Sequence, residues 1–212
     1  GSIADITIFS FHPVKTITTG EGGMITTNNK EYFEKASLSR NHGIIKSREL
    51  QNKYGGWFYD IENVSFNFRL TDIQAALGIS QLKKAETFIK KRRNKWNKYK
   101  ETLSKLPQLA LPVEKKDSIS AWHLFPIRID SSQTKVTRNE LYQKLTNAGI
   151  GVQVHYIPIH YLSFYRQFIV VNEKFPVSEN YYNSALSLPL YPTLARNEQI
   201  YVVETLKKIL HE

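Results

Sequence analysis

The stretch Ser10-Phe-His-Pro-Val-Lys15-Thr-Ile-Thr-Thr-Gly-Glu-Gly-Gly-Met-Ile-Thr-Thr-Asn28 is the most informative part of the sequence. Residues 5–11 alternate apolar side chains as a strand does, and residues 23–27 predict a second strand after a glycine-rich turn. Lys15 therefore stands just past a strand end, five residues after a serine hydroxyl. That arrangement fits an amine held at a fixed point for Schiff-base chemistry, whose neighbours lower its pKa. A surface lysine in a turn would show the same pattern, so the residues alone leave both interpretations open.

The chain around this stretch predicts a mixed α/β architecture. Asn28 or Asn29 is expected to cap a helix that ends near Arg40, and residues 42–67 have the composition of a long loop. Residues 71–107 predict one long helix, with a bend expected near Gly78. We expect residues 1–70 to be the end of a large domain and this helix to link it to a second domain.

The remaining residues, 108–212, predict a small α/β domain. Strands are expected over 123–129 and 151–156, and helices near Ser178 and over 196–210. Thr137-Arg-Asn-Glu140 has the pattern of a capping box, which opens a helix that should end at Gly149.

Composition excludes several classes of site. The chain has 212 residues, a formal net charge of +10 and no cysteine, so it has no disulfide, thiolate zinc site or cysteine nucleophile. His12, His123 and His160 lack metal-ligand spacing with any carboxylate, which predicts no metal site. No apolar run approaches the roughly 20 residues that span a bilayer. We therefore expect a cytoplasmic protein with no membrane partner.

The basic segment Lys83–Lys100 has two interpretations. A positive charge of this density suits nucleic acid. However, apolar and aromatic residues recur at alternating steps of three and four, which is typical of an amphipathic helix with one buried stripe. The stripe is formed by Leu82, Ala85, Ile89, Arg92, Trp96, Tyr99, Leu103 and Leu106. A solvated helix face is favoured, and no nucleic-acid partner is predicted, because no nucleic-acid-binding motif accompanies the lysines.

Four ordered segments resemble one enzyme family. The Lys15 stretch looks like the cofactor-lysine segment of the DegT/DnrJ/EryC1/StrS sugar aminotransferases. Arg40-Asn-His-Gly43 and Phe66-Asn67-Phe-Arg69 also match, as does Gly151-Val-Gln-Val-His-Tyr-Ile-Pro158-Ile-His160 with Ser187-Leu-Pro-Leu-Tyr191 downstream. The resemblance implies the C-terminal portion of a fold-type-I transferase dependent on pyridoxal 5'-phosphate (PLP). Within the family, residues 151–156 together with Ser163-Phe-Tyr-Arg166 look most like the UDP-4-amino-4,6-dideoxy-N-acetyl-altrosamine transaminases of pseudaminic acid synthesis.

The resemblance also implies roles for individual residues. Lys15 would be the Schiff-base lysine and move a proton, and Ser10 would contact the cofactor phosphate or lie beside the substrate. Asn67 would reach the phosphate in the partner subunit of a homodimer with shared active sites. Without the resemblance, Asn67 would pass for a turn asparagine. The sugar-nucleotide site would be lined by Gln153, Val154, His155 and Tyr156.

The implied reaction moves an amino group from glutamate to a UDP-linked 4-keto-6-deoxy sugar, in cell-surface or flagellar glycan biosynthesis. Related PLP-dependent sugar dehydratases replace the lysine with histidine, so Lys15 favours transamination. The family's acidic partner of the pyridine nitrogen precedes the lysine, and Asp5 is too close to Lys15 to serve. We therefore expect a fragment that binds PLP poorly alone. A catalytically inactive interaction module remains the alternative.

Overall fold

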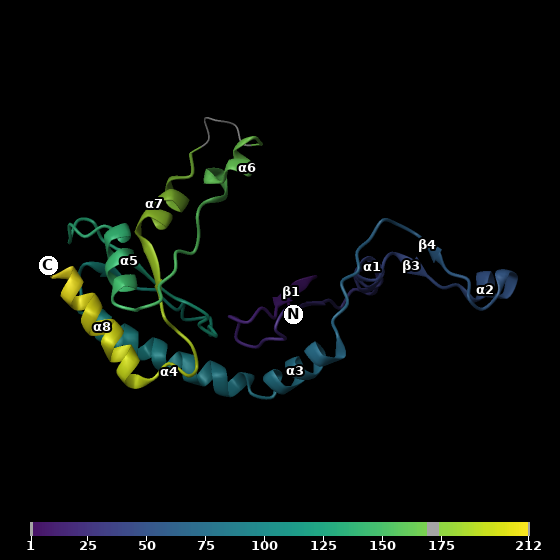
Figure 1. Cartoon of the computed structure of the whole chain (residues 1–212), viewed down its shortest axis with the longest axis horizontal. Coiled ribbons are helices and arrows are strands. Elements are labelled where there is room, and N and C mark those ends of the chain that lie inside the picture. Colours follow the sequence, from purple (N-terminus) through teal and green to yellow (C-terminus); the bar gives the residue numbers. More distant parts are fainter. Residues whose placement is uncertain (1, 169–173, 212) are drawn as a thin grey trace. The chain divides into compact units, whose positions relative to one another are not determined.

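The structure is a computed structural model that describes residues 2–168 and 174–211 and divides into two compact units, Gly1–Ala85 and Glu86–Glu212 (Figure 1). The N-terminal unit contains β1 (Thr7–Ser10), β2 (Gly23–Thr26), α1 (Lys30–Arg40), β3 (Ile44–Ile45), α2 (Arg48–Tyr54), β4 (Asp60–Ile61) and α3 (Asp72–Leu82). The C-terminal unit is built from α4 (Ala85–Leu103), which starts at the boundary, β5 (Leu109–Ala110), β6 (Phe125–Ile129), α5 (Arg138–Asn147), the 3-10 helix η1 (Ile159–Tyr161), α6 (Ser163–Arg166), α7 (Pro176–Ser184), β7 (Ala185–Leu188) and α8 (Arg196–Leu210).

The two strands around the Lys15 stretch form an antiparallel pair, as the alternation predicts. β1 and β2 pair from Thr7 with Thr26 to Ser10 with Gly23. A side chain at Gly23 would put a Cβ 2.9 Å from the Phe9 carbonyl oxygen, so the close strand approach requires glycine. The next helix, α1, is capped by Asn29.

The expected loop over 42–67 contains regular structure. Ser47 caps the seven-residue helix α2, and β3 pairs with β4 on either side of it. The sequence could not reveal α2, because its residues are mostly polar and none is buried, so no apolar period marks it.

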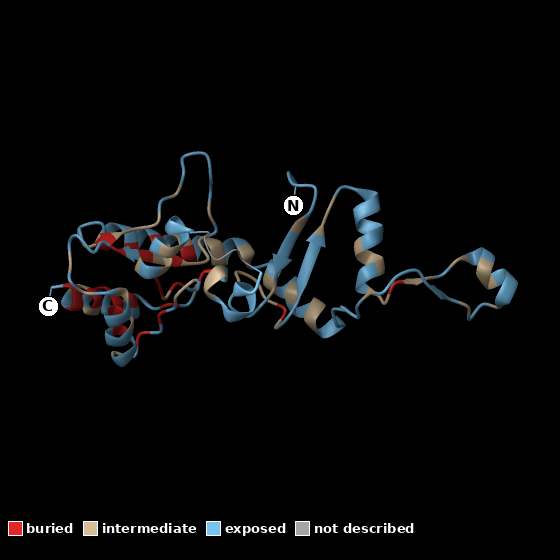
Figure 2. Ribbon diagram, turned by 90° about the horizontal axis from the view of Figure 1, so that it is seen from above, coloured by how far each residue is buried: buried red, intermediate tan, exposed pale blue. Residues whose placement is uncertain are grey.

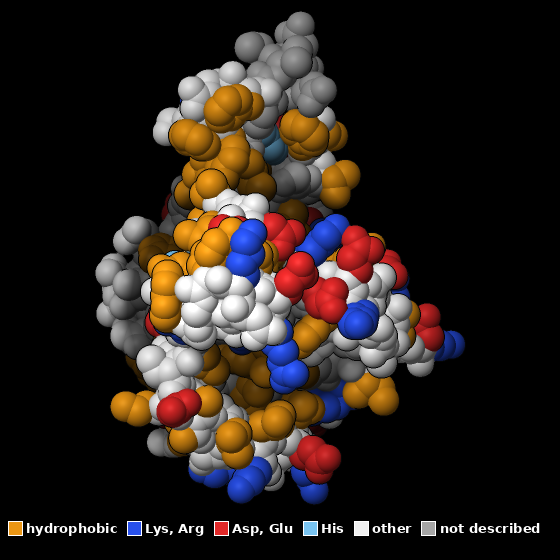
Figure 3. Space-filling model, turned by 90° about the vertical axis from the view of Figure 1, so that its right-hand side faces the viewer, with side chains coloured by type: hydrophobic (Ala, Val, Ile, Leu, Met, Phe, Trp, Pro, Cys, Tyr) orange, Lys and Arg blue, Asp and Glu red, His pale blue; other side chains and the backbone are white. Residues whose placement is uncertain are grey.

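The N-terminal unit has almost no buried side chains of its own. Among residues 2–85, only Thr19 and Gly43 are buried. Figure 2 shows this unit mostly as exposed, and Figure 3 shows hydrophobic side chains interspersed with charged ones on the face toward the viewer. Trp57 is 77% exposed and Ile73 is 84% exposed. Exposed apolar patches of this kind are typical of surfaces that bind another protein, a membrane or a ligand.

The long helix expected over 71–107 is two helices. α3 begins with a capping box of Thr71 and Gln74 and ends at Leu82, and α4 begins at Ala85. The break thus falls at Lys83-Lys84 and not at Gly78, which lies inside α3. The apolar period runs through the break without interruption, so the pattern alone gave no sign of it.

The core lies in the C-terminal unit. A three-stranded antiparallel sheet, in the order β5-β6-β7, packs with α4, α5 and α8. The segment 151–156, expected as a strand, contributes only a bridge between Gln153 and Ser187. The predicted helix over 196–210 is α8. The largest fully buried side chains are Tyr99, Phe125, Leu103, Ile127, Leu141, Leu145, Leu186 and Leu206.

Helix α4 buries the predicted stripe from Arg92 onward, whereas Ala85 and Ile89 are only partly buried. Arg92, Trp96 and Tyr99 are buried, whereas Lys90 and Lys91 on the same helix are exposed. The guanidinium of Arg92 donates to the carbonyl oxygens of Leu190 at 2.7 Å and His123 at 3.1 Å, which explains a charged residue in the stripe. Leu82, the first residue of the predicted stripe, is the last residue of α3; it is 63% exposed and is not part of the core.

An ion pair joins α4 to the segment after β5. Arg93 Nη1 lies 2.7 Å from Glu114 Oε1, and the backbone N–H of Ser120 donates to the same oxygen at 2.7 Å. The hydrogen bonds from the Arg93 side chain and then from the Ser120 backbone lower the pKa of Glu114 to about 2.

Candidate functional site

Lys15 lies in the loop between β1 and β2, and backbone hydrogen bonds hold the loop on both sides of Lys15. The Lys15 N–H donates to the His12 carbonyl at 2.9 Å, which forms a turn directly after β1. The Phe11 N–H donates to the Gly22 carbonyl at 2.9 Å, and the Thr19 N–H donates to the Phe11 carbonyl at 3.0 Å. The backbone on both sides of Lys15 is therefore fixed by the β1–β2 ribbon.

Thr19 packs against α3, and Gln74 of that helix forms a hydrogen bond to the same loop. Thr19 is buried, at 3% exposure, and its hydroxyl donates to the Glu21 carbonyl at 2.8 Å. Gln74 of α3 donates to the same carbonyl at 3.0 Å. A Cβ at Gly78 would lie 2.9 Å from Thr19 Cγ2, and one at Gly22 would overlap with Thr19 Oγ1. These two glycines make room for Thr19, a role that the sequence did not reveal for Thr19 or Gln74.

The two cofactor residues predicted on this loop have polar atoms that could bind a ligand. The Lys15 side chain is half-buried, and within residues 2–168 and 174–211 its amine makes no hydrogen bond or ion pair. Ser10, at the end of β1, is exposed and accepts a 3.5 Å hydrogen bond from the His12 N–H. An unengaged amine on a fixed turn and a hydroxyl at the adjacent strand end fit an aldehyde cofactor with a phosphate group.

Asn67 lies on a different segment of the N-terminal unit. The flanking backbone pairs with residues 39–42: the His42 N–H donates to the Phe66 carbonyl at 2.8 Å, and Asn67 forms a bridge with Asn41. The rings of Phe66 and Phe68 stack at 4.8 Å, and because alternate residues share a face, Asn67 lies on the opposite side of the extended segment. In the described part of the chain, no hydrogen bond joins Asn67 to Ser10 or Lys15.

The predicted substrate-side residues lie in the C-terminal unit. Gln153 and Ser187 exchange two backbone hydrogen bonds, of 3.2 and 2.8 Å, which attach the segment to β7. His155 Nδ1 lies 2.8 Å from Ser187 Oγ, and Tyr156 is 72% exposed. The structure thus places all four predicted residues on one segment, and it adds Ser187, which the sequence analysis did not include among the site residues.

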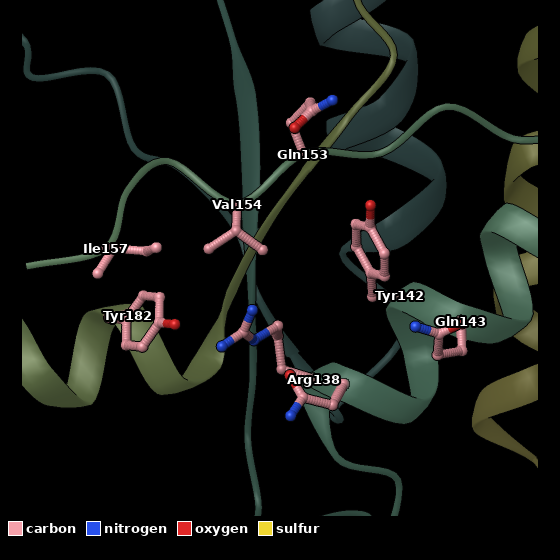
Figure 4. Close-up of a pocket in the computed structure, with 8 residues that line it drawn as sticks. Arg138, Tyr142, Gln143, Gln153, Val154, Ile157 and Tyr182 are labelled. Atoms are coloured by element: carbon pink, nitrogen blue, oxygen red, sulfur yellow. The ribbon is translucent and has the colours of Figure 1, made fainter. Parts of the chain in front are cut away.

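An open cavity of about 490 Å³ lies beside this segment (Figure 4). Gln153 and Val154 line it, whereas His155 and Tyr156 are not among its lining residues. The Arg138 guanidinium lies 4.8 Å from the ring centre of Tyr182, which is a cation–π distance. Cationic and aromatic groups with nearby amides suit a flat or anionic ligand. The lining residues are Arg138, Asn139, Tyr142, Gln143, Gln153, Val154, Ile157 and Tyr182.

The described residues contain neither a metal-binding cluster nor a helix that could span a membrane. In residues 2–168 and 174–211, no group of three or more His, Asp or Glu side chains is placed to hold a metal ion. His160 pairs with Glu179 at 3.0 Å and packs on Phe175. None of the helices described is both long and apolar enough to cross a bilayer.

Relatives of known sequence match the chain along its whole length. An uncharacterized protein of Methanocaldococcus jannaschii is 42% identical and covers 100% of this chain and 55% of its own length. The UDP-4-amino-4,6-dideoxy-N-acetyl-beta-L-altrosamine transaminase of Campylobacter jejuni is 38% identical, over 100% of this chain and 54% of its own. The chain therefore spans about half the length of the curated relatives that it matches.

Solved structures match the fold equally well. Helicobacter pylori PseC, an aminotransferase involved in pseudaminic acid biosynthesis, superposes with a TM-score of 0.87 at 31% identity, over 98% of this chain and 54% of its own. A Streptococcus pneumoniae protein assigned as a sugar aminotransferase superposes in its pyridoxamine-phosphate form with a TM-score of 0.88 at 30% identity, over 100% of this chain and 54% of its own. That protein has also been solved in its PLP form.

The family assignment follows from the match of a sequence model to almost the whole chain. The model of the DegT/DnrJ/EryC1/StrS aminotransferase family matches residues 1–207. Aminotransferases of this family depend on PLP, in agreement with the PLP and pyridoxamine-phosphate forms of the structural relative. The α/β units agree with that match, and the chain belongs to the DegT/DnrJ/EryC1/StrS aminotransferase family.

Proposed function

We propose that this chain supplies the cofactor lysine and the substrate-side segment of a PLP-dependent nucleotide-sugar aminotransferase. The reaction would transfer an amino group from glutamate to a UDP-linked 4-keto-6-deoxy sugar, in cell-surface or flagellar glycan biosynthesis. The observation that carries the proposal is the unengaged Lys15 amine on a turn fixed by the β1–β2 ribbon and by Thr19. The altrosamine transaminase of Campylobacter jejuni, at 38% identity, supports the substrate class.

The N-terminal unit would bind the cofactor, and the C-terminal unit would bind the sugar nucleotide. When bound, PLP supplies an electron sink for charge that develops at the substrate carbon. Lys15 would hold the cofactor covalently and move a proton at that carbon, and Ser10 would donate to the phosphate. In the other unit, the segment Gln153–Tyr156 would bind the sugar nucleotide. The cationic Arg138 in the cavity beside that segment suits an anionic ligand of this kind.

The exposed apolar surface of the N-terminal unit supports a homodimer with shared sites. A unit with only Thr19 and Gly43 buried among residues 2–85 has most of its apolar surface available for other subunits or segments. In such a dimer Asn67 would reach the cofactor phosphate of the partner. Its place on a segment whose side chains are exposed leaves the amide accessible for that contact.

The same surface keeps one alternative open, in which the chain is a catalytically inactive interaction module. By the resemblance, the acid that keeps the pyridine nitrogen protonated precedes the cofactor lysine, and Asp5 is too close to Lys15 to serve. If no such acid is supplied from elsewhere, the chain would associate through its apolar surface without catalysing transfer. A related PLP-dependent sugar-modifying reaction would use the same Lys15 loop, and product analysis separates it from transamination.

The deciding experiment uses an enzyme completed with the half of the Campylobacter jejuni relative that this chain does not span, which we call the complemented enzyme. After PLP loading and borohydride reduction, peptide mapping should locate the cofactor on Lys15, because the fixed, unengaged amine is the expected nucleophile. Lys35→Ala is the matched control, since Lys35 is exposed and pairs with Glu31 on α1. A label on another lysine, or normal labelling of Lys15→Ala, would contradict the assignment. A glutamate-dependent amino sugar product would then distinguish transamination from the alternatives.

A further inference from the structure

His12 begins the turn that carries Lys15. The Lys15 N–H closes this turn by donating to the His12 carbonyl at 2.9 Å, and Pro13 occupies the second position, where its fixed φ favours a turn. The Val14 N–H donates to Nδ1 of the His12 ring at 3.4 Å. Proline has no N–H, so both backbone donors of residues 13–15 bond to His12.

His12 also connects the turn to the end of β1. Its own N–H donates to Ser10 Oγ in a longer contact of 3.5 Å. A serine oxygen that accepts this bond keeps its hydroxyl hydrogen for another acceptor. His12 therefore links Ser10 to Lys15, the two residues proposed to bind the phosphate and the aldehyde group of the cofactor.

The contacts of the His12 ring fit one protonation state. A nitrogen that accepts the Val14 N–H carries no proton, so the neutral ring has its proton on Nε2. Nε2 lies 3.8 Å from Glu21 Oε1, and a carboxylate at that place favours a proton on the same nitrogen. A proton on Nδ1 would instead face the Val14 N–H, donor against donor.

We propose that His12 is a positioning residue for Lys15, whose turn it holds through the Nδ1 acceptor of a ring protonated on Nε2. The consequence for catalysis rests on the proposed function, whereas the contact within the turn does not. On that function, the turn holds the Lys15 amine at the cofactor aldehyde, and a looser turn presents the amine there less often. His12 itself is assigned no contact with cofactor or substrate.

Three variants separate the Nδ1 acceptor from the rest of the His12 side chain. In His12→Asn, the side-chain oxygen takes the place of Nδ1, because asparagine commonly accepts from the N–H two residues further on. In His12→Gln, the polar atoms lie one bond farther out, near the position of Nε2. His12→Phe keeps a ring without any acceptor, and far-UV circular dichroism verifies that each variant is folded.

Hydrogen exchange of the Val14 amide tests the contact without a catalytic assay. In the complemented enzyme without PLP, this amide should exchange about fivefold faster in His12→Gln and His12→Phe, roughly the value of one hydrogen bond, and His12→Asn should restore slow exchange. Nitrogen NMR with 15N-histidine at roughly pH 8, where histidine side chains are usually neutral, should show a protonated Nε2 in the signal that His12→Asn removes.

Four results would overturn the contact within the turn. They are equal Val14 exchange in all four proteins, fast exchange in His12→Asn, slow exchange in His12→Phe, and a protonated Nδ1 in the wild type. None of these results depends on whether the chain is an aminotransferase.

Borohydride reduction tests the link from the turn to Lys15. The PLP concentration that gives half-maximal labelling of Lys15 should rise about fivefold in His12→Gln and His12→Phe and stay near the wild-type value in His12→Asn. Unchanged labelling together with faster Val14 exchange would refute the positioning role. A wild-type complemented enzyme with a protected Val14 amide but no label on Lys15 would instead count against the proposed function.

Discussion

Replacement of Trp96 by alanine tests whether α4 carries the core of the C-terminal unit. The Trp96 ring is 2% exposed and stacks on Trp122 with ring centres 4.1 Å apart. It also packs edge-to-face with the Phe125 ring, with ring centres 5.9 Å apart. Truncating a buried tryptophan costs about 3 to 5 kcal/mol of unfolding free energy, and aromatic pairs contribute about 0.5 to 1.5 kcal/mol of such a loss.

The indole N–H of Trp96 places the expected loss of unfolding free energy toward the lower end of that range. The indole N–H of Trp96 is buried and has no hydrogen-bond partner among the described residues. Its removal therefore breaks no hydrogen bond and relieves one unsatisfied donor. We expect about 3 kcal/mol, which lowers the melting midpoint of a unit of this size by roughly 10 to 15 °C.

Urea unfolding followed by far-UV circular dichroism measures the change without relying on tryptophan fluorescence. The matched control is Lys90→Gln with Lys91→Gln on the exposed face of the same helix, for which a change of no more than about 0.5 kcal/mol is expected. Equal, small effects of the two sets of changes would refute the assignment of the stripe to the core. They would also reopen the nucleic-acid interpretation of the lysines, which a steep salt dependence of binding would support.

Three further predictions concern the Lys15 loop, the dimer and the acid limit of stability. In the complemented enzyme, mixing Asn67→Ala with Lys15→Ala subunits should restore about half of a normal dimer's activity, since one site of each mixed dimer has both defects and the other neither; no recovery despite subunit exchange would refute shared sites. Gly78→Ala should weaken PLP retention because the new Cβ would lie 2.9 Å from Thr19 Cγ2. Adding Thr19→Ser, which removes that methyl group, should restore retention, and a double variant that stays defective would contradict this explanation. Because the folded pKa of Glu114 is about 2, below its ordinary 4.5, its ion pair adds stability above about pH 4.5 that is lost as the pH falls toward 2. The stability difference between wild type and Glu114→Gln should shrink across that window in acid unfolding monitored by circular dichroism, and a constant difference would contradict this account.

Local patterns in the sequence were sufficient for the elements whose signals lie within a few residues. Alternation around Lys15 predicted β1 and β2, and the capping box of Thr137 and Glu140 predicted the start of α5. Side-chain caps and apolar periods act between residues three or four positions apart, so the sequence shows them directly. The motif segments likewise identified the family, which the match over residues 1–207 confirms.

Only the tertiary structure decided the features that depend on distant residues. The break between α3 and α4 at Lys83-Lys84 lies within an unbroken apolar period, and α2 has no apolar period at all. Thr19 is buried because Gly78, far along the chain, leaves room for it. His155 and Ser187 meet only because β7 and the segment at Gln153 pair across more than 30 residues. A one-dimensional pattern records which face a side chain takes, whereas the partner on that face is set by the packing of the whole unit.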